Sequence, residues 1–164
     1  MKSVYLETTV ISYLTGRPSC NIVQAGHQEV TRQWWETRRG DFDLFISQLV
    51  IDEAGRGDTD AAHRRLAAIT NLPLLDPTDE TITVAESLLQ RHALPRHASD
   101  DALHIALSAA RGIDYLLTWN FKHIANAEKL WLIEATIRSH GLEPPIICTP
   151  EELLGGNHEE RPHR

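Results

Sequence analysis

The segment Asp100–Asn126 reads DDALHIALSAARGIDYLLTWNFKHIAN, and the rest of the fold can be predicted outward from it. It predicts a helix from Ser99 to Arg111 that opens on two carboxylates, with Gly112 as its terminator. The apolar run Asp114–Thr118 then predicts a buried strand. A helix, a glycine turn and a short apolar strand in this order are typical of a parallel sheet covered by helices.

Short apolar segments alternate with helices along the rest of the chain, without an internal repeat or a linker. We predict strands at Lys2–Glu7, Asp43–Ile46 and Ile146–Cys148, and a brief one at Leu72–Leu75. This pattern predicts an α/β fold with helices on both faces of a parallel sheet. We expect a single domain over residues 1–154 and a polar, disordered tail over 155–164.

Composition and charge limit the classes of function. The 164 residues are 41% hydrophobic and 24% charged, and no apolar run is long enough to predict a membrane span. No signal peptide and no disulfide framework is expected, which predicts a cytoplasmic location. The net charge is −7, whereas nucleic-acid-binding proteins usually carry a basic surplus. A nucleic-acid role would therefore need a local basic patch, bound cations or a basic partner.

Polar residues follow two of the predicted strands. Glu7 ends the first strand, and Thr118 and Asn120 end the strand in the opening segment. Reactive residues of parallel sheets gather beyond the carboxyl ends of strands, where the strand order reverses, so we expect these ends to be neighbours. A buried carboxylate at Glu7 is costly unless it is paired or binds a metal. The alternative is that Glu7 caps the strand end by bonding Thr8 and Thr9, and ordinary turn chemistry is the alternative for Asn120.

Helical geometry adds a second acid. In the predicted helix Gln48–Ala54, Glu53 falls within the apolar arc, whereas Asp52 falls on the opposite, solvated side. An unpaired carboxylate in an apolar arc would be unfavourable, so we predict that Glu53 has a partner in a site. The alternative is a structural salt bridge to an arginine such as Arg56 or Arg64.

The third position is the start of the helix in the opening segment. With Ser99 as the N-cap, Asp100 and Asp101 fall in the first turn, where the helix dipole favours negative charge without any site. Asp101 lies at the edge of the polar face, so it is the preferred site residue. Asp100 and Thr8 are second choices. His104, on the same polar face, is interpreted as an oriented neighbour of the aspartates rather than a ligand.

Together these residues predict a metal site. Glu7, Glu53 and Asp101 are the candidate ligands, and Thr118 and Asn120 complete the candidate catalytic set. Oxygen ligands suit Mg²⁺ or Mn²⁺ rather than zinc. The sequence has no HExxH motif, CxxC pair or phosphate-binding glycine loop, which argues against a zinc protease or an NTPase. No paired-aspartate motif follows the first strand, which argues against an aspartyl-phosphate phosphatase.

Four segments of the chain resemble the motifs of the PIN domain family, in particular those of VapC-type toxins. They are YLETTVISYL (5–14), SQLVIDE (47–53), DDALHIALSAA (100–110) and DYLLTWNFKHIAN (114–126). The resemblance extends from Val4 to about Leu154. It implies a three-layer α/β/α sandwich with a five-stranded parallel sheet and Mg²⁺- or Mn²⁺-dependent hydrolysis of RNA phosphodiester bonds. It also implies a homodimer and a cognate antitoxin, as in the toxin of a type II toxin–antitoxin pair.

The resemblance also assigns roles to individual residues. Glu7, Glu53 and Asp101 match the first three acids of the family's site. Asn120 stands where many members have a fourth acid, and Thr118 matches the small hydroxyl residue before it. Two differences are expected to weaken or reposition the metals, because Glu7 replaces the usual aspartate and Asn120 lacks a negative charge.

The remaining candidates concern partners. Arg17, Arg96, Lys122 and His123 could hold the RNA backbone, although solvated surface cations are an equal interpretation. The rival function is a non-catalytic or weakly catalytic module that binds RNA or a protein partner. Trp35, predicted to lie off the core stripe of its helix, is the feature that favours a partner surface. The alternative for Trp35 is cover by neighbouring arginine stems.

Overall fold

The computed structural model of this chain describes residues 1–155 and contains one parallel sheet of four strands. The strand order is β2-β1-β3-β4, so the order reverses between β1 and β3. The strands are β1 (Lys2–Leu6), β2 (Phe42–Phe45), β3 (Tyr115–Leu117) and β4 (Ile146–Cys148). Apart from residue 155, the tail predicted at 155–164 lies outside the described residues.

The expectation of a five-stranded sheet is wrong. The segment predicted as a brief strand, Leu72–Leu75, pairs with the sheet only through an isolated bridge between Ile46 and Leu74. The two backbone hydrogen bonds that it shares with Ile46 run from Ile46 N to Pro73 O (3.0 Å) and from Leu75 N to Ile46 O (2.8 Å). Pro73 has no N–H to donate, which limits a ladder at this edge.

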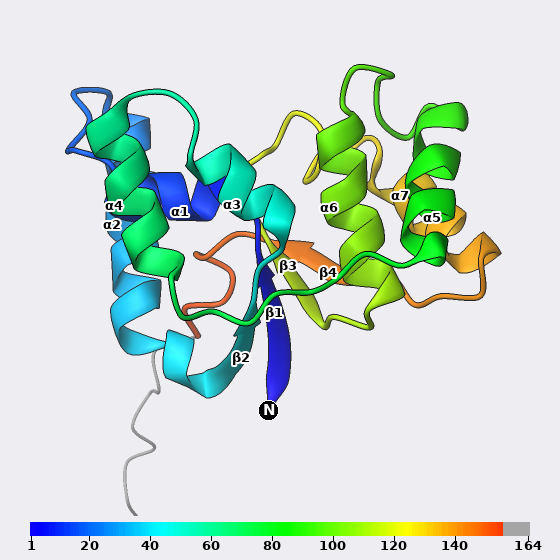
Figure 1. Cartoon of the computed structure of the whole chain (residues 1–164), viewed down its shortest axis with the longest axis horizontal. Coiled ribbons are helices and arrows are strands. Elements are labelled where there is room, and N and C mark those ends of the chain that lie inside the picture. The colour runs from blue at the N-terminus through cyan, green and yellow to red at the C-terminus, as the bar shows by residue number, and fades with distance from the viewer. Residues whose placement is uncertain (156–164) are drawn as a thin grey trace, which may run out of the picture.

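Seven α-helices in the described chain cover the sheet in two groups (Figure 1). Helix α1 packs against α2, α3 and α4, and helix α5 packs against α6 and α7, which is compatible with a three-layer sandwich. Within residues 1–155 no helix has the length and apolar content needed to cross a bilayer. The helices are α1 (Thr8–Thr15), α2 (Ile22–Thr37), α3 (Gln48–Ala54), α4 (Thr59–Ile69), α5 (Asp79–Gln90), α6 (Ser99–Ala110) and α7 (Leu130–Ser139).

The two central strands form the middle of the core. Val4, Tyr5 and Leu6 of β1 and Leu116 and Leu117 of β3 are fully buried. Continuous apolar runs of this kind are typical of parallel strands that are covered on both faces. The sequence pattern therefore predicted the two strands that position the site.

Helix α6 differs from its sequence-based description in two respects. Ala98, not Ser99, is the N-cap, and no side chain among residues 1–155 caps this helix end. The side interpreted as polar is also partly buried, because His104 and Ser108 are both fully enclosed. Ser108 donates to the carbonyl oxygen of His104 at 2.9 Å, so its hydroxyl is satisfied inside the helix.

The neighbouring ends of β1 and β3 lie side by side, as predicted. Leu6 pairs with Leu117, and the backbone N–H of Glu7 then donates to Leu117 O at 3.1 Å. Glu7 and Thr118, which are 111 positions apart in the chain, therefore leave the sheet next to each other.

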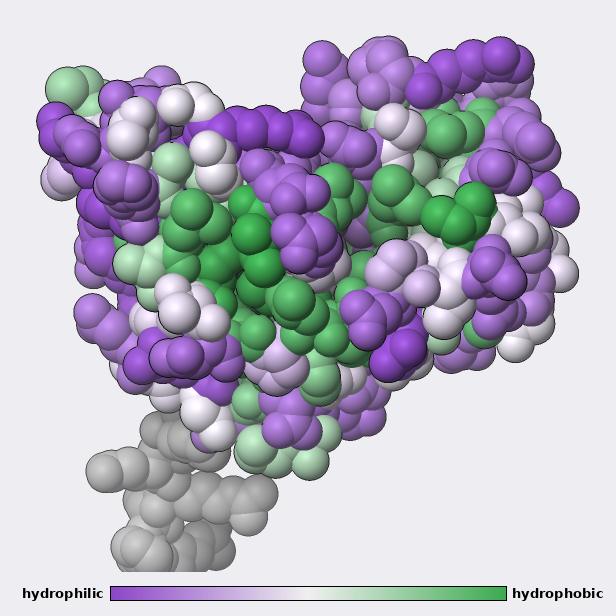
Figure 2. All heavy atoms as spheres, in the orientation of Figure 1, coloured by the Kyte–Doolittle hydropathy of each residue, from purple (hydrophilic) through white to green (hydrophobic). Residues whose placement is uncertain are grey.

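An apolar groove lies beside the edge strand β2. It is lined mainly by aliphatic side chains, and Leu74 within it is 45% exposed. Figure 2 shows hydrophobic side chains gathered on the face of the molecule that carries α3 and α4. The lining residues are Ile46, Ile51, Leu66, Ile69, Thr70, Leu72 and Leu74.

Replacing Leu116 with alanine should lower the free energy of unfolding by about 3 kcal/mol, measured by urea unfolding. The reason is that Leu116 is fully buried in the central strand β3, so truncation leaves a cavity. Ile146→Ala on the neighbouring strand is the control, because Ile146 is 60% exposed and its truncation should cost less than about 1 kcal/mol. Equal losses in the two variants would contradict the assignment of β3 to the centre of the core.

Candidate metal centre

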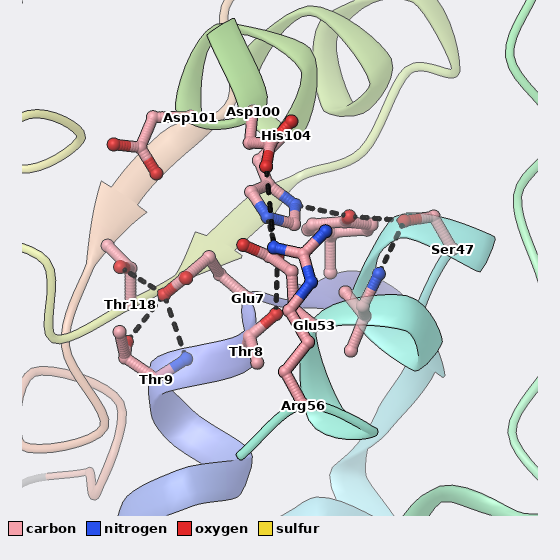
Figure 3. Close-up of polar contacts among 12 residues, drawn as sticks. Glu7, Thr8, Thr9, Ser47, Glu53, Arg56, Asp100, Asp101, His104 and Thr118 are labelled. Atoms are coloured by element: carbon pink, nitrogen blue, oxygen red, sulfur yellow. Dashed lines mark hydrogen bonds and ion pairs between the residues drawn. The ribbon is translucent and has the colours of Figure 1, made fainter. Parts of the chain in front are cut away.

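Glu7 is the most buried acid of the site, with 3% of its surface exposed. It follows β1 directly and is the N-cap of α1. Its Oε2 accepts hydrogen bonds from Thr9 N (3.2 Å), Thr9 Oγ1 (2.5 Å) and Thr118 Oγ1 (2.8 Å) (Figure 3). Within the described part of the chain, the other oxygen, Oε1, accepts no hydrogen bond. Capping and membership of the site, considered above as alternatives, therefore occur together.

Glu53 comes from the last turn of α3, and its side chain is 20% exposed. One of its oxygens, Oε1, contacts Thr8 Oγ1 at 2.7 Å and His104 Nε2 at 2.5 Å. Glu53 does not form the salt bridge to Arg56 or Arg64 that was considered as the alternative. The guanidinium of Arg56 lies 3.8 Å from Asp100, and Arg64 donates to a backbone carbonyl of α1.

His104 connects Glu53 to the interior of the protein. Its second ring nitrogen, Nδ1, lies 2.7 Å from the Tyr5 hydroxyl, which lies 2.7 Å from Ser47 Oγ. Ser47 is in turn the N-cap of α3 and accepts from Val50 N. A chain of hydrogen bonds thus joins β1, α3 and α6 through His104 (Figure 3).

The pKa shifts of these groups follow from their burial and contacts. Burial raises the pKa of Glu7 above its usual value, although the nearby His104 and the bonds from Thr9 and Thr118 act in the opposite direction. Burial also raises the pKa of Glu53, but the bond and the charge of His104, the bond from Thr8 and the charge of Arg56 together outweigh it, and the net shift is downward. Burial lowers the pKa of His104, and the two glutamates overcome this and raise it. Glu53 and His104 therefore form an ion pair beside Glu7.

Three groups in this centre lie close enough to share a cation. Glu7, Glu53 and His104 each offer a ligand atom, and these atoms all lie within 4.8 Å of one another. This group could hold a metal ion. The sequence predicted Glu7 and Glu53 in the set but interpreted His104 only as a neighbour.

Asp101 lies outside that group of three. Its Oδ2 contacts His123 Nδ1 at 2.8 Å, and both side chains are less than one-fifth exposed. Figure 3 shows Asp101 in the first turn of α6, apart from the contact between Glu53 and His104. Its charge nevertheless contributes to the raised pKa of His104, which places Asp101 at the margin of the centre. Asp100, the second choice, lies nearer the surface, where it faces Arg56.

Thr118 and Asn120, which follow β3, hold other groups in place rather than offering free ligand atoms. Thr118 is fully buried, donates to Glu7, and accepts from Asn120 N at 2.9 Å. The amide oxygen of Asn120 accepts from His123 N at 3.0 Å, which is the turn chemistry considered above. Asn120 therefore shapes the loop that carries His123.

The candidate RNA-binding residues are divided among different places. Arg17 and Lys122 are exposed, whereas His123 is engaged by Asp101. Arg96 lines a separate hollow with Glu86 near the end of α5. The structure therefore does not gather these four residues into one cluster.

The surroundings of Trp35 match the alternative considered above, in which arginine side chains cover it. The residue is half-buried, and the Arg39 guanidinium lies over its ring with Cζ 4.6 Å from the ring centroid. An arginine side chain therefore covers this tryptophan.

Sequence reasoning missed two polar partners of His104 and its neighbours, Tyr5 and Ser47. Tyr5 and Glu7 are two positions apart, so the alternation of side chains along a strand already placed both on one face. His104 follows Asp101 by three positions, which likewise places both on one side of α6. These spacings could have indicated the tyrosine–histidine contact.

Comparison of the chain with protein-family models and with curated proteins finds no match. The resemblance to the PIN domain family therefore stays a prediction that rests on the residues themselves.

In metal-free buffer at about pH 8, Glu7→Gln should raise the free energy of unfolding by about 1 kcal/mol. Burial raises the pKa of Glu7, so the stability that the protonated group contributes at low pH is lost as the pH rises through its folded-state pKa. The amide avoids this loss and keeps an oxygen for Thr9 and Thr118. Urea unfolding measures the difference, which should shrink toward about pH 4.

Glu36→Gln is the matched control, because Glu36 is exposed on α2 and should show no such pH-dependent difference. A Glu7→Gln variant that is less stable than wild type at about pH 8 would show that burial of the charged carboxylate is not the dominant effect.

Proposed function

We propose that this chain is a divalent-metal-dependent endoribonuclease that hydrolyses RNA phosphodiester bonds. The observation that carries the proposal is the convergence of the Glu7 and Glu53 carboxylates beside His104, with one side-chain atom of each residue within 4.8 Å of the other two. The group stands beyond the carboxyl end of β1, where the strand order reverses. This is the place where α/β sheets bind ligands and carry out chemistry.

The arrangement of the carboxylate oxygens supports a hard cation. In each glutamate one oxygen is held by protein donors, while the other, Glu7 Oε1 or Glu53 Oε2, accepts no hydrogen bond from the described residues. Each carboxylate is therefore oriented through one oxygen and has the other available for a ligand. Carboxylate oxygens favour Mg²⁺ or Mn²⁺ over softer metals.

The imidazole of His104 supports the carboxylates from behind. Both of its nitrogens already have partners, Glu53 and Tyr5. We therefore assign His104 the role of orienting Glu53, as side chains that bond a metal ligand do in other metal sites. Asp101, held by His123, is the third carboxylate that we assign to the site.

The chemistry follows from these assignments. A bound cation would lower the pKa of a coordinated water and polarise the scissile phosphate. Thr9 and Thr118 keep Glu7 oriented, and His104 does the same for Glu53. The cation would also offset the negative charge of the chain, which otherwise repels phosphate.

RNA as the substrate comes from the resemblance to the PIN domain family and from two exposed cations. Arg17 lies just after α1, and Lys122 lies in the loop after β3. By the same resemblance, we propose that the protein acts as a homodimer and as the toxin of a type II pair with a cognate antitoxin. The cytoplasmic location that we propose comes instead from the expected lack of a disulfide framework.

A second candidate function is a non-catalytic or weakly catalytic module that binds RNA or a protein partner. The observation that favours it is that two expected site residues have other partners. Asp101 contacts His123, and the Asn120 oxygen bonds the backbone of the same residue. This candidate predicts that the chain binds no divalent cation.

Calorimetric titration with Mn²⁺ separates the two functions. We expect wild type to bind Mn²⁺ and Glu53→Gln to bind it at least on the order of 100-fold more weakly, because a charged ligand oxygen is lost. Asp52→Asn is the matched control on the same helix, since Asp52 is exposed and its side chain accepts a hydrogen bond from Gln48. Absence of heat from wild type would rule out the nuclease and favour the binding module.

Cleavage of a mixed pool of single-stranded RNA tests the activity itself. Glu53→Gln and Asp101→Asn should each reduce the Mn²⁺-dependent rate at least on the order of 100-fold, whereas Asp52→Asn should retain it. The rate is measured by gel electrophoresis of the RNA over a range of Mn²⁺ concentrations. Unchanged cleavage by Asp101→Asn would remove this residue from the site.

A further inference from the structure

Four aromatic rings meet beside the metal centre. Trp119 and Phe121 come from the loop after β3, Tyr13 comes from α1 and His27 comes from α2. His27 stacks on Trp119 with 4.1 Å between the ring centroids and 17° between the planes. The remaining contacts have centroids between 5.9 and 6.2 Å apart. We call these four residues the aromatic cluster.

The base of the aromatic cluster is fixed in place. Trp119 is 6% exposed, its indole N–H donates to Thr31 Oγ1 at 2.8 Å, and its backbone N–H donates to Thr9 Oγ1 at 2.9 Å. Thr31 follows His27 by one helical turn and bonds its carbonyl oxygen. A surface held in this way loses little freedom when a ligand binds to it.

The outer part of the aromatic cluster is open to solvent. Phe121 is 51% exposed, while Tyr13 and His27 are half-buried. A single exposed phenylalanine is ordinary on a protein surface. An exposed ring that packs against a rigid stack of other rings, however, presents the kind of surface on which a flat ligand stacks.

The aromatic cluster is joined to the metal centre through one residue. Thr9 donates to Glu7 Oε2 and accepts from the backbone of Trp119. Tyr13 follows Thr9 by four positions, so both lie on one face of α1. The cluster therefore begins one hydrogen-bonded residue away from the carboxylate of Glu7.

Two basic residues are close in sequence to members of the aromatic cluster, in a chain that is acidic overall. Lys122 is adjacent to Phe121, and Arg17 follows Tyr13 by four positions. Both side chains are exposed. Aromatic rings interleaved with cations are the combination that binds single-stranded nucleic acid, because the rings stack on bases and the cations neutralise phosphates.

We propose that the aromatic cluster is a base-stacking subsite, in which Phe121 receives one base of a single-stranded RNA next to the phosphate held at the metal centre. This subsite rests on the proposed ribonuclease function and adds a means of positioning the substrate. Stacking is tolerant of base identity, so the subsite selects unpaired nucleotides rather than a sequence.

Binding of a short fluorescently labelled single-stranded RNA to the full chain, measured by anisotropy in EDTA, tests the subsite. Phe121→Ala should weaken binding on the order of 10-fold, which is the loss expected for one base–aromatic stack. Phe121→Trp keeps a ring and should bind as wild type does. Trp131→Ala is the matched control, because Trp131 is 67% exposed on α7 and lies outside the aromatic cluster.

A series of RNAs with one abasic position each makes the test specific for stacking. Wild type should bind one RNA of the series more weakly than the intact RNA, because the missing base is the one that stacks on Phe121. Phe121→Ala should bind that abasic RNA and the intact RNA equally well. Equal losses in the two proteins, or no weakening by Phe121→Ala, would overturn the subsite. A chain that binds a protein ligand and has no affinity for single-stranded RNA would overturn the subsite as well.

A parallel assay of Mn²⁺-dependent cleavage separates this proposal from the proposed function. Cleavage by wild type together with unchanged RNA binding by Phe121→Ala would leave the nuclease standing and remove the subsite. Binding that depends on Phe121 without any cleavage would keep the subsite and remove the nuclease.

Discussion

The buried carboxylate of Glu7 is the constraint on which the site depends. It stands where β1 ends beside β3, and a charge in such a place is unfavourable unless donors or a cation surround it. Thr9 and Thr118 provide donors from two elements that only the parallel pairing of β1 with β3 brings together. All of these donors reach one oxygen, so the protein fixes the direction of the carboxylate and leaves its other oxygen for a ligand.

A second polar contact connects the two groups of helices. Glu53 on α3 belongs to the first group and His104 on α6 to the second, and they meet at 2.5 Å. Replacing a buried ion pair with apolar side chains is often neutral for stability, so the pair is better explained by orientation than by strength. Tyr5 and Ser47 extend the contact into the sheet and the cap of α3. The direction of the Glu53 carboxylate is therefore set by three elements.

The fold could be predicted where local pattern and tertiary structure agree. The apolar runs at β1 and β3 predicted the central strands, and the glycine after α6 predicted its end. The prediction was wrong at Leu72–Leu75, because an apolar composition does not reveal whether a ladder has enough donors, and Pro73 leaves only one bridge with the sheet. The burial of His104 was not predicted, because its helix position alone placed it on a polar side, and Glu53 and Tyr5 from other elements enclose it.

The sequence by itself determined the alternation of strands and helices, the placing of Glu7 and Thr118 at neighbouring strand ends, and the inward direction of Glu53. These features follow from periodicity and from the geometry of parallel sheets. Only the tertiary structure decided that His104 joins the two glutamates, that Asp101 pairs with His123, and that Trp119 stacks with His27. The physical reason is that each of these contacts joins side chains from elements far apart in the chain, where angstrom-scale differences in packing decide which groups touch.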